Sequence, residues 1–366
     1  MRKLVADNIA SLTPYEPGKP VEEVMREHGL THCVKLASNE NPLGPSPLAL
    51  DAITGHMKEV YRYPDSSGFH LKRKLARVYE VPESRMVLGN GSVEIIELVA
   101  RTFLAPLEEA IVSEHAFVMF SLAIRAVNGR AVVVPSRKFA HDLDAMAAAV
   151  TERTKVVYIA NPNNPTGTMA TREELDRFFS RIPKDVIVVL DEAYCEYIKN
   201  PSYPNGLDDL REGKNVVVLR TFSKIYGLAG LRVGYAFAPE ALVDAMERVR
   251  TPFNTTHLSQ HAAIAALDDR EHVERTYRVN NRERAFLAEE LEKLQVPFVP
   301  SVTNFLLVDL CKPCEPVFAA LLSRGVILRP LTGYGLPTHF RITVGTRPEN
   351  EEMLRTLVAL REEGTL

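Results

Sequence analysis

The stretch Val186-Ile-Val-Val-Leu-Asp-Glu-Ala-Tyr194 is the part of the sequence from which the fold follows most directly. Its first five residues are apolar, and four of them are β-branched. The run lacks the alternation of polar and apolar residues that marks a strand with one face in water. A continuous apolar run of this length is typical of a strand buried on both faces, as in a parallel sheet covered by helices.

Similar apolar runs recur between residues 86 and 237, and amphipathic stretches of helical period separate several of them. Strands separated by helices predict right-handed crossovers and a doubly wound, mostly parallel seven-stranded α/β sheet. The runs expected to form its strands are 86–88, 110–112, 131–134, 156–159, 186–190, 216–219 and 233–237. The helices expected between them include 93–103, 117–127 and 172–181.

The pattern changes after Pro252, where two helical stretches, 258–267 and 271–294, precede short strands and further helices. The strands are expected at 304–308, 326–328 and 341–344, and the further helices around 316–323 and 349–361. We therefore expect a large domain over residues 46–250 and a smaller α+β domain over residues 251–366. The first 45 residues contain five prolines and are expected to form an extended arm (1–45) that joins the small domain.

Composition and charge exclude several classes of protein. The 366 residues include 44 Lys and Arg against 47 Asp and Glu, which gives a net charge of −3, and 46% of residues are hydrophobic. A balance so close to neutral offers no electrostatic footprint for nucleic acid or for an anionic membrane. No apolar run approaches the ~20 residues needed to span a bilayer, and the first residues lack the apolar core of a signal peptide. We expect a cytoplasmic protein.

The four cysteines give no evidence of a metal or redox site. Cys311 and Cys314 form a Cys-Lys-Pro-Cys that could be half a zinc site or a redox pair. No second pair of ligands follows at suitable spacing, so reduced thiols and no bound metal are expected.

Polar groups follow four of the apolar runs. In open parallel sheets, ligands bind beyond the carboxyl ends of the strands, so these groups are candidates for a site. The segments are Gly89-Asn-Gly-Ser-Val-Glu94, Asn161-Pro-Asn-Asn-Pro-Thr-Gly167, Asp191-Glu-Ala-Tyr194 and Thr221-Phe-Ser-Lys224, the last followed by Gly230-Leu-Arg232.

Three of these segments have a structural explanation beside a functional one. The small residues at 89–92 could seat a phosphate on a helix N-terminus, but glycine and serine are also common in turns and caps. Asp191 could cap the next turn or meet a ligand as a buried carboxylate. Lys224 could be solvated or could form a Schiff base, and Arg232 could pair with a surface carboxylate or with a phosphate.

Together the segments fit one ligand, pyridoxal phosphate, which has a phosphate, a basic ring nitrogen and an aldehyde. Lys224 would hold the aldehyde as an imine, and Asp191 would keep the ring nitrogen protonated so that the ring acts as an electron sink. Asn164 and Tyr194 would hydrogen-bond the phenolic oxygen of the ring, and Phe117 could stack on its face.

Taken in order, these segments resemble the fold-type-I pyridoxal-phosphate-dependent aminotransferases. The narrower resemblance, which covers about residues 11 to 361, is to the histidinol-phosphate aminotransferase family. It rests on Ser38-Asn-Glu-Asn-Pro-Leu-Gly-Pro-Ser-Pro47, Tyr61-Arg-Tyr-Pro-Asp65, Val326-Ile-Leu-Arg-Pro330 and Arg341-Ile-Thr-Val-Gly-Thr346.

The resemblance implies a role for each matching residue toward the cofactor. Lys224 is implied as the Schiff-base lysine and as the base that moves a proton between the substrate and the cofactor. Tyr63 is implied to reach the cofactor phosphate from the other subunit of a homodimer. The other residues implied near the phosphate are Gly91, Ser92, Val93, Thr221, Ser223 and Arg232.

The resemblance also implies four substrate-binding residues. Arg341 would bind the substrate α-carboxylate or, for a phosphorylated amino alcohol, lie near the phosphate. Arg329 would hold the distal anion, Tyr15 would close the pocket from the N-terminal arm, and Asn41 is assigned to the substrate as well.

Two positions depart from the family pattern. Val93 replaces the aspartate of the usual Gly-Ser-Asp-Glu, so a side-chain contact is lost while the backbone N–H remains. Phe120 stands where a tyrosine is common and therefore carries no phenol.

The implied reaction is transamination of L-histidinol phosphate with 2-oxoglutarate, which gives imidazole acetol phosphate and L-glutamate by a ping-pong mechanism. An aromatic amino-acid aminotransferase on the same scaffold is the first alternative, and a decarboxylase of a phosphorylated amino acid is the second. A pyridoxal-phosphate-sensing transcription regulator is disfavoured, because about 45 proline-rich residues before the large domain are too few for a DNA-binding module.

Overall fold

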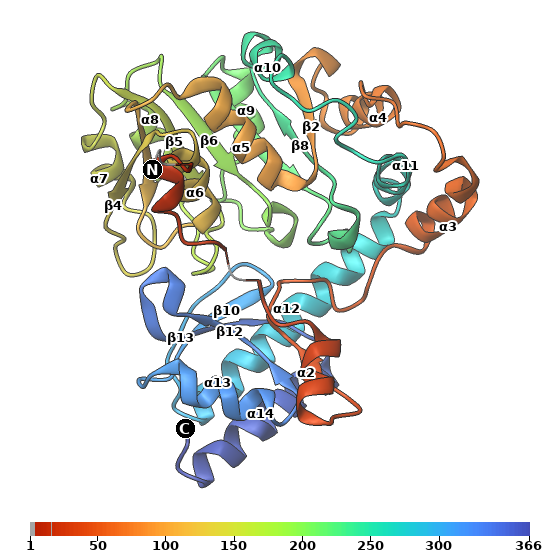
Figure 1. The fold of residues 1–366 in the computed structure, drawn as a ribbon, viewed down its shortest axis with the longest axis vertical. Helices are drawn as coiled ribbons and strands as arrows, with labels where there is room; N and C mark the ends of the chain where they lie inside the picture. The colour runs from red at the N-terminus through yellow and green to blue at the C-terminus, as the bar shows by residue number, and fades with distance from the viewer. Residues whose placement is uncertain (1–3, 16) are drawn as a thin grey trace.

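A seven-stranded sheet forms the centre of the larger lobe in the computed structural model, which describes residues 4–15 and 17–366 (Figure 1). The strand order is β2-β8-β7-β6-β5-β3-β4, and only β8 runs antiparallel to its neighbours. The strands are β2 (Met86–Gly89), β3 (Glu109–Ser113), β4 (Arg130–Val134), β5 (Thr154–Ala160), β6 (Ile187–Asp191), β7 (Val216–Thr221) and β8 (Gly234–Phe237). All seven predicted runs form strands of this sheet, and the predicted fold class is confirmed.

Helices cover both faces of this sheet, and the side chains of each strand alternate between two apolar clusters. Val188 and Leu190 of β6 belong to one cluster, whereas Ile187 and Val189 belong to the other. The helices around the sheet are α5 (Gly91–Phe103), α6 (Val118–Ala126), α7 (Leu143–Ala148), α8 (Arg172–Phe179), α9 (Gly206–Arg211) and α10 (Glu240–Glu247). This two-sided cover explains why the strands appear in the sequence as continuous apolar runs.

Strand β4 is the exception to two-sided burial. It lies at the edge of the sheet, pairs only with β3, and leaves Val133 47% exposed. The sequence predicted burial on both faces for this run as well, and that prediction is wrong. An apolar β-branched run does not distinguish an edge strand from a central one.

The smaller lobe contains a four-stranded antiparallel sheet in the order β12-β13-β10-β9. Its elements are β9 (Phe298–Val299), β10 (Phe305–Asp309), β12 (Arg329–Leu331), β13 (Leu336–Thr343), α13 (Cys314–Leu322) and α14 (Arg347–Glu362). The long helix α12 (Arg270–Lys293) runs from the larger lobe into the smaller one (Figure 1). Most of these elements lie where the sequence predicts them, but the short strands β9 and β12 were not predicted.

The N-terminal arm touches both lobes. Helix α1 (Asp7–Ala10) lies on α6, where the Asn8 side chain donates a hydrogen bond to the carbonyl of Arg125 at 3.0 Å. Strand β1 (Val34–Lys35) pairs in parallel with β11 (Val326–Ile327) of the smaller lobe. Between α1 and β1, residues Val21–His28 form the helix α2, so the prediction of an extended arm is wrong there. The domain boundaries themselves stay a prediction.

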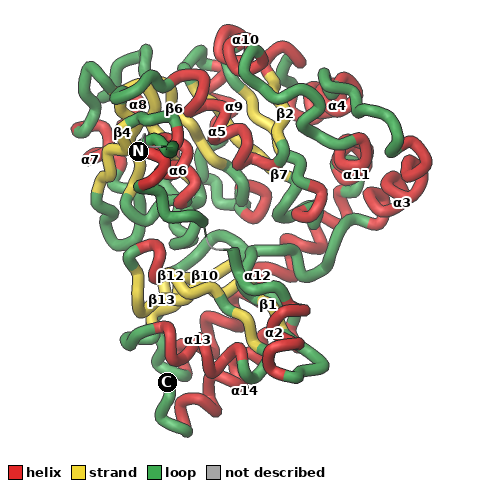
Figure 2. The backbone as a smooth tube through the Cα atoms, in the orientation of Figure 1, coloured by secondary structure: helices red, strands yellow, loops and turns green. Residues whose placement is uncertain are grey.

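A cluster of helices lies at the β2 edge of the larger lobe (Figure 2). Its members are α3 (Pro47–His56), the 3₁₀ turn η1 (Met57–Glu59), α4 (Phe69–Tyr79) and α11 (His257–Ala266). Within residues 4–15 and 17–366, no helix combines the length and the apolar character that crossing a membrane requires.

Candidate active site

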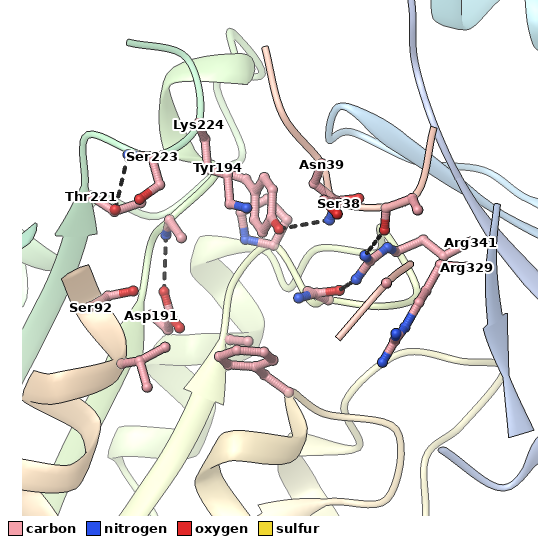
Figure 3. Close-up of a pocket in the computed structure, with 18 of the residues that line it drawn as sticks. Ser38, Asn39, Ser92, Asp191, Tyr194, Thr221, Ser223, Lys224, Arg329 and Arg341 are labelled. Carbon is pink, nitrogen blue, oxygen red and sulfur yellow. Dashed lines mark hydrogen bonds between the residues drawn. The ribbon is translucent and has the colours of Figure 1, made fainter. Parts of the chain in front are cut away.

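A cavity between the two lobes collects the polar groups that follow the strands of the large sheet (Figure 3). Thirteen of the predicted site residues line it: Tyr15, Ser92, Val93, Phe117, Asn164, Asp191, Tyr194, Thr221, Ser223, Lys224, Arg232, Arg329 and Arg341. They come from the N-terminal arm, from the starts of α5 and α6, from the last residues of β6 and β7 and the segments that follow β5, β6 and β7, from the turn before β8 and from the sheet of the smaller lobe.

One end of the cavity is a cradle for an anion. Helix α5 begins at Gly91, so the first N–H groups of the helix and the Ser92 side chain lie at the cavity wall. Arg232 donates to the Ser223 hydroxyl at 3.3 Å and to the Ala229 carbonyl at 3.0 Å. Within the described residues it forms no ion pair with a carboxylate. A helix N-terminus beside an unneutralised guanidinium is suited to a phosphate.

Two glycines allow this cradle to form. Gly91 has φ +75°, and a Cβ there would lie 2.2 Å from a terminal nitrogen of Arg232. Gly234 on β8 packs against the start of α5, where a Cβ would lie 2.7 Å from the backbone nitrogen of Ser92. Gly91 does not itself line the cavity but lets the guanidinium lie against the helix start.

Lys224 lies three residues beyond the end of β7, and its amine lies 5.5 Å from the centre of the Tyr194 ring. No carboxylate in the described part of the chain forms an ion pair with it. Burial lowers its pKa to about 8, and the positive charges of Arg341 and Arg232 act in the same direction. A large fraction of the amine is therefore neutral near pH 8, as a nucleophile or a base requires.

Asp191 is the last residue of β6 and is 6% exposed. Its Oδ1 accepts a hydrogen bond from the Ala193 N–H at 3.1 Å. Burial raises the pKa of this carboxyl to about 6, although that N–H and the charge of Lys224 act against the rise. A positively charged group of a ligand would stabilise the ionised carboxylate.

Tyr194 and Asn164 line the cavity, and both are hydrogen-bonded to groups outside the large sheet. The Tyr194 hydroxyl accepts from the side-chain amide of Asn39 at 2.9 Å. The Asn164 Oδ1 accepts from a terminal nitrogen of Arg341 at 2.7 Å. Burial raises the pKa of Tyr194 to about 12, so its hydroxyl is neutral near pH 7.

Two arginines line the side of the cavity formed by the smaller lobe. Arg329 begins β12 and lies directly opposite Arg341 on β13. Like charges directly opposite each other on neighbouring strands repel, and an anion bound between them would offset this repulsion. Arg341 also donates to the Ala37 carbonyl at 2.7 Å, and its buried Nε has no partner among the described residues. This wall therefore retains a donor for an anionic ligand.

Aromatic rings close the cavity. The Tyr15 ring lies 5.3 Å from the Arg329 guanidinium, and Phe117 stands at the start of α6. Phe120 is fully buried and stacks on Tyr158 in the core, so its missing phenol leaves the cavity lining unchanged.

Two predicted site residues lie elsewhere. Asn41 does not line the cavity, because its side-chain amide donates to the Ile225 carbonyl at 2.9 Å and to the Thr276 hydroxyl at 3.2 Å. Tyr63 is 82% exposed and stacks on Phe253 at a ring distance of 4.8 Å, outside the cavity.

Ser38 and Asn39 line the cavity but were not among the predicted site residues. Both belong to the quoted segment 38–47, in which Asn39 and Asn41 are two residues apart. The segment pointed to this region, but only the structure shows which asparagine faces inward.

No metal centre is found in the part of the chain that the structure describes, where no group of three or more His, Cys, Asp or Glu side chains could hold an ion. The four cysteines are free thiols, with Cys314 buried and Cys311 exposed.

Residues 31–357 match the family model for aminotransferase class I and II. The chain belongs to this family. This aminotransferase of class I and II is 47% identical over 361 residues to histidinol-phosphate aminotransferase 1 of Nitrosococcus oceani, and the alignment covers 99% of this chain and 98% of that protein. It is 48% identical over 356 residues to histidinol-phosphate aminotransferase 2 of Pseudomonas aeruginosa, covering 97% and 96%. The predicted resemblance to histidinol-phosphate aminotransferases is confirmed.

The fold of this aminotransferase has a solved counterpart. It matches the crystal structure of histidinol-phosphate aminotransferase from Sinorhizobium meliloti in complex with pyridoxal-5'-phosphate, with a TM-score of 0.90 and 28% identity over 99% of both chains.

Proposed function

We propose that this chain catalyses amino-group transfer from L-histidinol phosphate to 2-oxoglutarate, giving imidazole acetol phosphate and L-glutamate in histidine biosynthesis. The observation that carries the proposal is the sequence identity of 47% and 48%, over nearly the whole chain, to two histidinol-phosphate aminotransferases. The cavity adds to it, because it offers separate sites for two anions. The cradle at α5 suits a cofactor phosphate, and the Arg329–Arg341 wall suits an anionic substrate.

Pyridoxal phosphate is the cofactor we propose for this cavity. The residues present fit it: a phosphate cradle that a Cβ at Gly91 would fill, a buried carboxylate at Asp191 and an amine at Lys224 that no carboxylate of the described chain neutralises. When bound, the cofactor supplies an aldehyde that takes up the amino group and a ring that withdraws electrons from the reacting carbon. Ser92, Ser223 and Arg232 would hold its phosphate, and Asp191 would face its ring nitrogen.

Lys224 is the proposed catalytic residue. With a pKa of about 8, its Nζ releases a proton at little cost near neutral pH and can take up the proton of the substrate carbon. The lower pKa comes from burial and from nearby arginine charges, which an anion bound between those arginines would partly cancel. The lysine is therefore suited to act first as a nucleophile and then as a base.

The two amino-group donors, L-histidinol phosphate and L-glutamate, both carry an anionic group that the Arg329–Arg341 wall can bind. L-Histidinol phosphate carries a phosphate and L-glutamate carries two carboxylates, so each brings an anionic group to the same side of the cavity. A planar guanidinium binds either group through paired hydrogen bonds. Tyr15 beside Arg329 would cover the bound substrate from the N-terminal arm.

We also propose a cytoplasmic homodimer whose active sites are shared. Tyr63 belongs to an exposed apolar segment that includes Val60 and Tyr61, 60% and 74% exposed. Its proposed role is to reach the cofactor phosphate of the partner subunit. Subunits with Lys224→Ala mixed with subunits with Tyr63→Ala should then regain activity at limiting cofactor, because one site of each mixed dimer has both residues. Mixing Lys224→Ala with Asp191→Asn is the control that should restore nothing, and recovery equal to this control would contradict shared sites.

The reaction itself is tested by steady-state kinetics of the purified protein. We expect kcat/KM for L-histidinol phosphate to exceed that for L-phenylalanine with 2-oxoglutarate as common acceptor, with the parallel double-reciprocal lines of a ping-pong mechanism. A higher kcat/KM for phenylalanine would replace the proposal with an aromatic amino-acid aminotransferase. Release of carbon dioxide without an oxo-acid would indicate a decarboxylase.

A further inference from the structure

Asn39 is held at the junction of the two lobes by hydrogen bonds at every polar group. It is 1% exposed and has φ 55°, a conformation that asparagine tolerates better than most residues. Its backbone N–H donates to the Thr343 hydroxyl at 2.9 Å, and its carbonyl accepts from the Asn304 amide at 3.0 Å. The backbone of this residue is therefore fixed against the smaller lobe.

The contact with Thr343 orients the side-chain amide of Asn39. The Thr343 hydroxyl accepts from the Asn39 N–H, so its single proton remains to be donated to Asn39 Oδ1 at 3.2 Å. This contact leaves Nδ2 as the group that faces the Tyr194 hydroxyl at 2.9 Å (Figure 3). A flipped amide would place Nδ2 at the Thr343 hydroxyl and lose the bond that this hydroxyl donates to Oδ1, because an amide nitrogen cannot accept.

The proton of Tyr194 must then go elsewhere. An amide nitrogen donates and cannot accept, so the Tyr194 oxygen is the acceptor in this contact. Its own O–H proton has no acceptor in the described chain, although the side chain is buried at the cavity wall. A buried hydroxyl with a proton to donate is suited to an acceptor on a ligand in that cavity.

We propose that Asn39 is a positioning residue that makes Tyr194 a hydrogen-bond donor to the ring oxygen of bound pyridoxal phosphate. The inference rests on the proposed cofactor and deepens it, because it states how an arm residue sets the direction of one hydrogen bond in the site. Burial raises the pKa of Tyr194 to about 12, so the proton is present at working pH.

The bound cofactor offers a readout that does not depend on turnover. Its absorbance changes with the protonation of its conjugated groups, and a donor at the ring oxygen favours the form in which that oxygen is negatively charged. Losing the donor should therefore raise the pH at which the absorbance changes. A hydrogen bond of ordinary strength corresponds to a shift of about 0.5–1 pH unit.

The test uses Asn39→Asp, Tyr194→Phe and the double variant, each as the cofactor-loaded protein. Aspartate keeps the shape of asparagine but turns the donor into an acceptor, so the Tyr194 proton would be drawn to the protein and away from the ring. We expect Asn39→Asp and Tyr194→Phe each to raise the transition pH. The double variant should show less than the sum, because both changes remove the same hydrogen bond.

Additive shifts would overturn the role of Asn39, because they would show that the aspartate acts through its charge alone. An unshifted Asn39→Asp protein would overturn it equally. Asn39→Gly is the control for folding, because glycine adopts the positive φ of this position without strain. Unfolding of the cofactor-free variant measures what the loss of the side chain costs in stability. A wild-type protein without a pH-dependent cofactor absorbance would instead contradict the proposed function, and this inference with it.

Discussion

Asp191 and Glu192 are adjacent buried carboxylates at the end of β6, and their surroundings differ completely. Glu192 accepts two hydrogen bonds from Arg220, at 3.0 and 2.7 Å, and one from the Gly206 N–H at 2.6 Å. Asp191 accepts one from the Ala193 N–H and forms no ion pair within the described residues. One carboxylate is neutralised inside the protein, and the other faces the cavity.

The same contrast holds one strand further along the sheet. Arg220 is the fifth residue of β7 and is paired with Glu192 and Asn205 on the side away from the cavity. Lys224 follows the strand on the cavity side and has no carboxylate paired with it in the described chain. Glu192 and Arg220 are therefore matched to each other inside the protein, whereas Asp191 and Lys224 face the cavity without a paired charge in the described chain. This difference separates structural from functional charge where burial alone does not.

The largest expected effect lies on the cavity side of this contrast. Replacing Lys224 by alanine should lower kcat for transamination by at least about 10³-fold, because it removes the proposed nucleophile and base together. The free energy of unfolding of the cofactor-free protein should change little, since Lys224 has no ion pair to lose. Turnover assays and denaturant unfolding of the same preparation check the two statements, and residual activity above one hundredth of wild type would contradict the assignment.

For the buried ion pair of Arg220 and Glu192, we expect a substitution to change the stability of the protein. Arg220→Met should lower the free energy of unfolding by about 3–5 kcal/mol, because Glu192 is left as an unpaired buried charge. Adding Glu192→Leu should recover most of this loss, because an apolar pair replaces the ion pair. Urea unfolding of both variants measures this directly. An Arg220→Met protein as stable as wild type would contradict the distinction between the buried ion pair and the charges that face the cavity.

The next effect concerns Arg329, which lines the cavity on the side of the smaller lobe. Charge-assisted hydrogen bonds are worth roughly 1.5–3 kcal/mol, so Arg329→Ala should lower kcat/KM for histidinol phosphate by about 10–10³-fold. Phenylalanine has no distal anion, so its kcat/KM should fall much less. Arg324→Ala, which removes an exposed arginine paired with Glu363, is the control for charge alone. An equal fall of kcat/KM for both substrates would show that Arg329 binds the α-carboxylate or has a structural role.

The smallest expected effect concerns pH. The pKa of Asp191 is raised by burial to about 6 in the folded chain from an ordinary value of 3.8. Its contribution to stability is therefore fully present below about pH 4 and is lost as the pH rises through about 6. Asp191→Asn should make the cofactor-free protein more stable than wild type above pH 6, on the order of 1–3 kcal/mol. Identical pH profiles for the two proteins would show that the carboxyl is compensated inside the chain.

The seven strands and most cavity residues could be predicted because both depend on local signals. Apolar runs mark buried strands, and polar residues that follow them reach the carboxyl edge of a parallel sheet whatever the rest of the chain does. Asp191 and Lys224 are therefore recognisable from a few neighbouring residues. The paired role of Glu192 is not, because Arg220 lies 28 residues away and only the register of β6 and β7 brings them together.

The errors have the same physical origin. The choice between Asn39 and Asn41 depends on Thr343, which is 304 residues from Asn39. The helix α2 in a proline-rich arm is stabilised by burying Val24 against the smaller lobe, and no local pattern of that arm reports this contact. The short strands β9 and β12 exist because β10 and β13 supply their hydrogen bonds. Contacts between distant segments decide each of these features.

The central claim is that the cavity binds pyridoxal phosphate through Lys224. It is tested most directly by reducing the cofactor-loaded protein with borohydride, digesting it and locating the modified lysine by mass spectrometry. We expect one modified peptide, which contains Lys224 and is absent from the Lys224→Ala variant. Cofactor fixed to any other lysine, or to none, would contradict it.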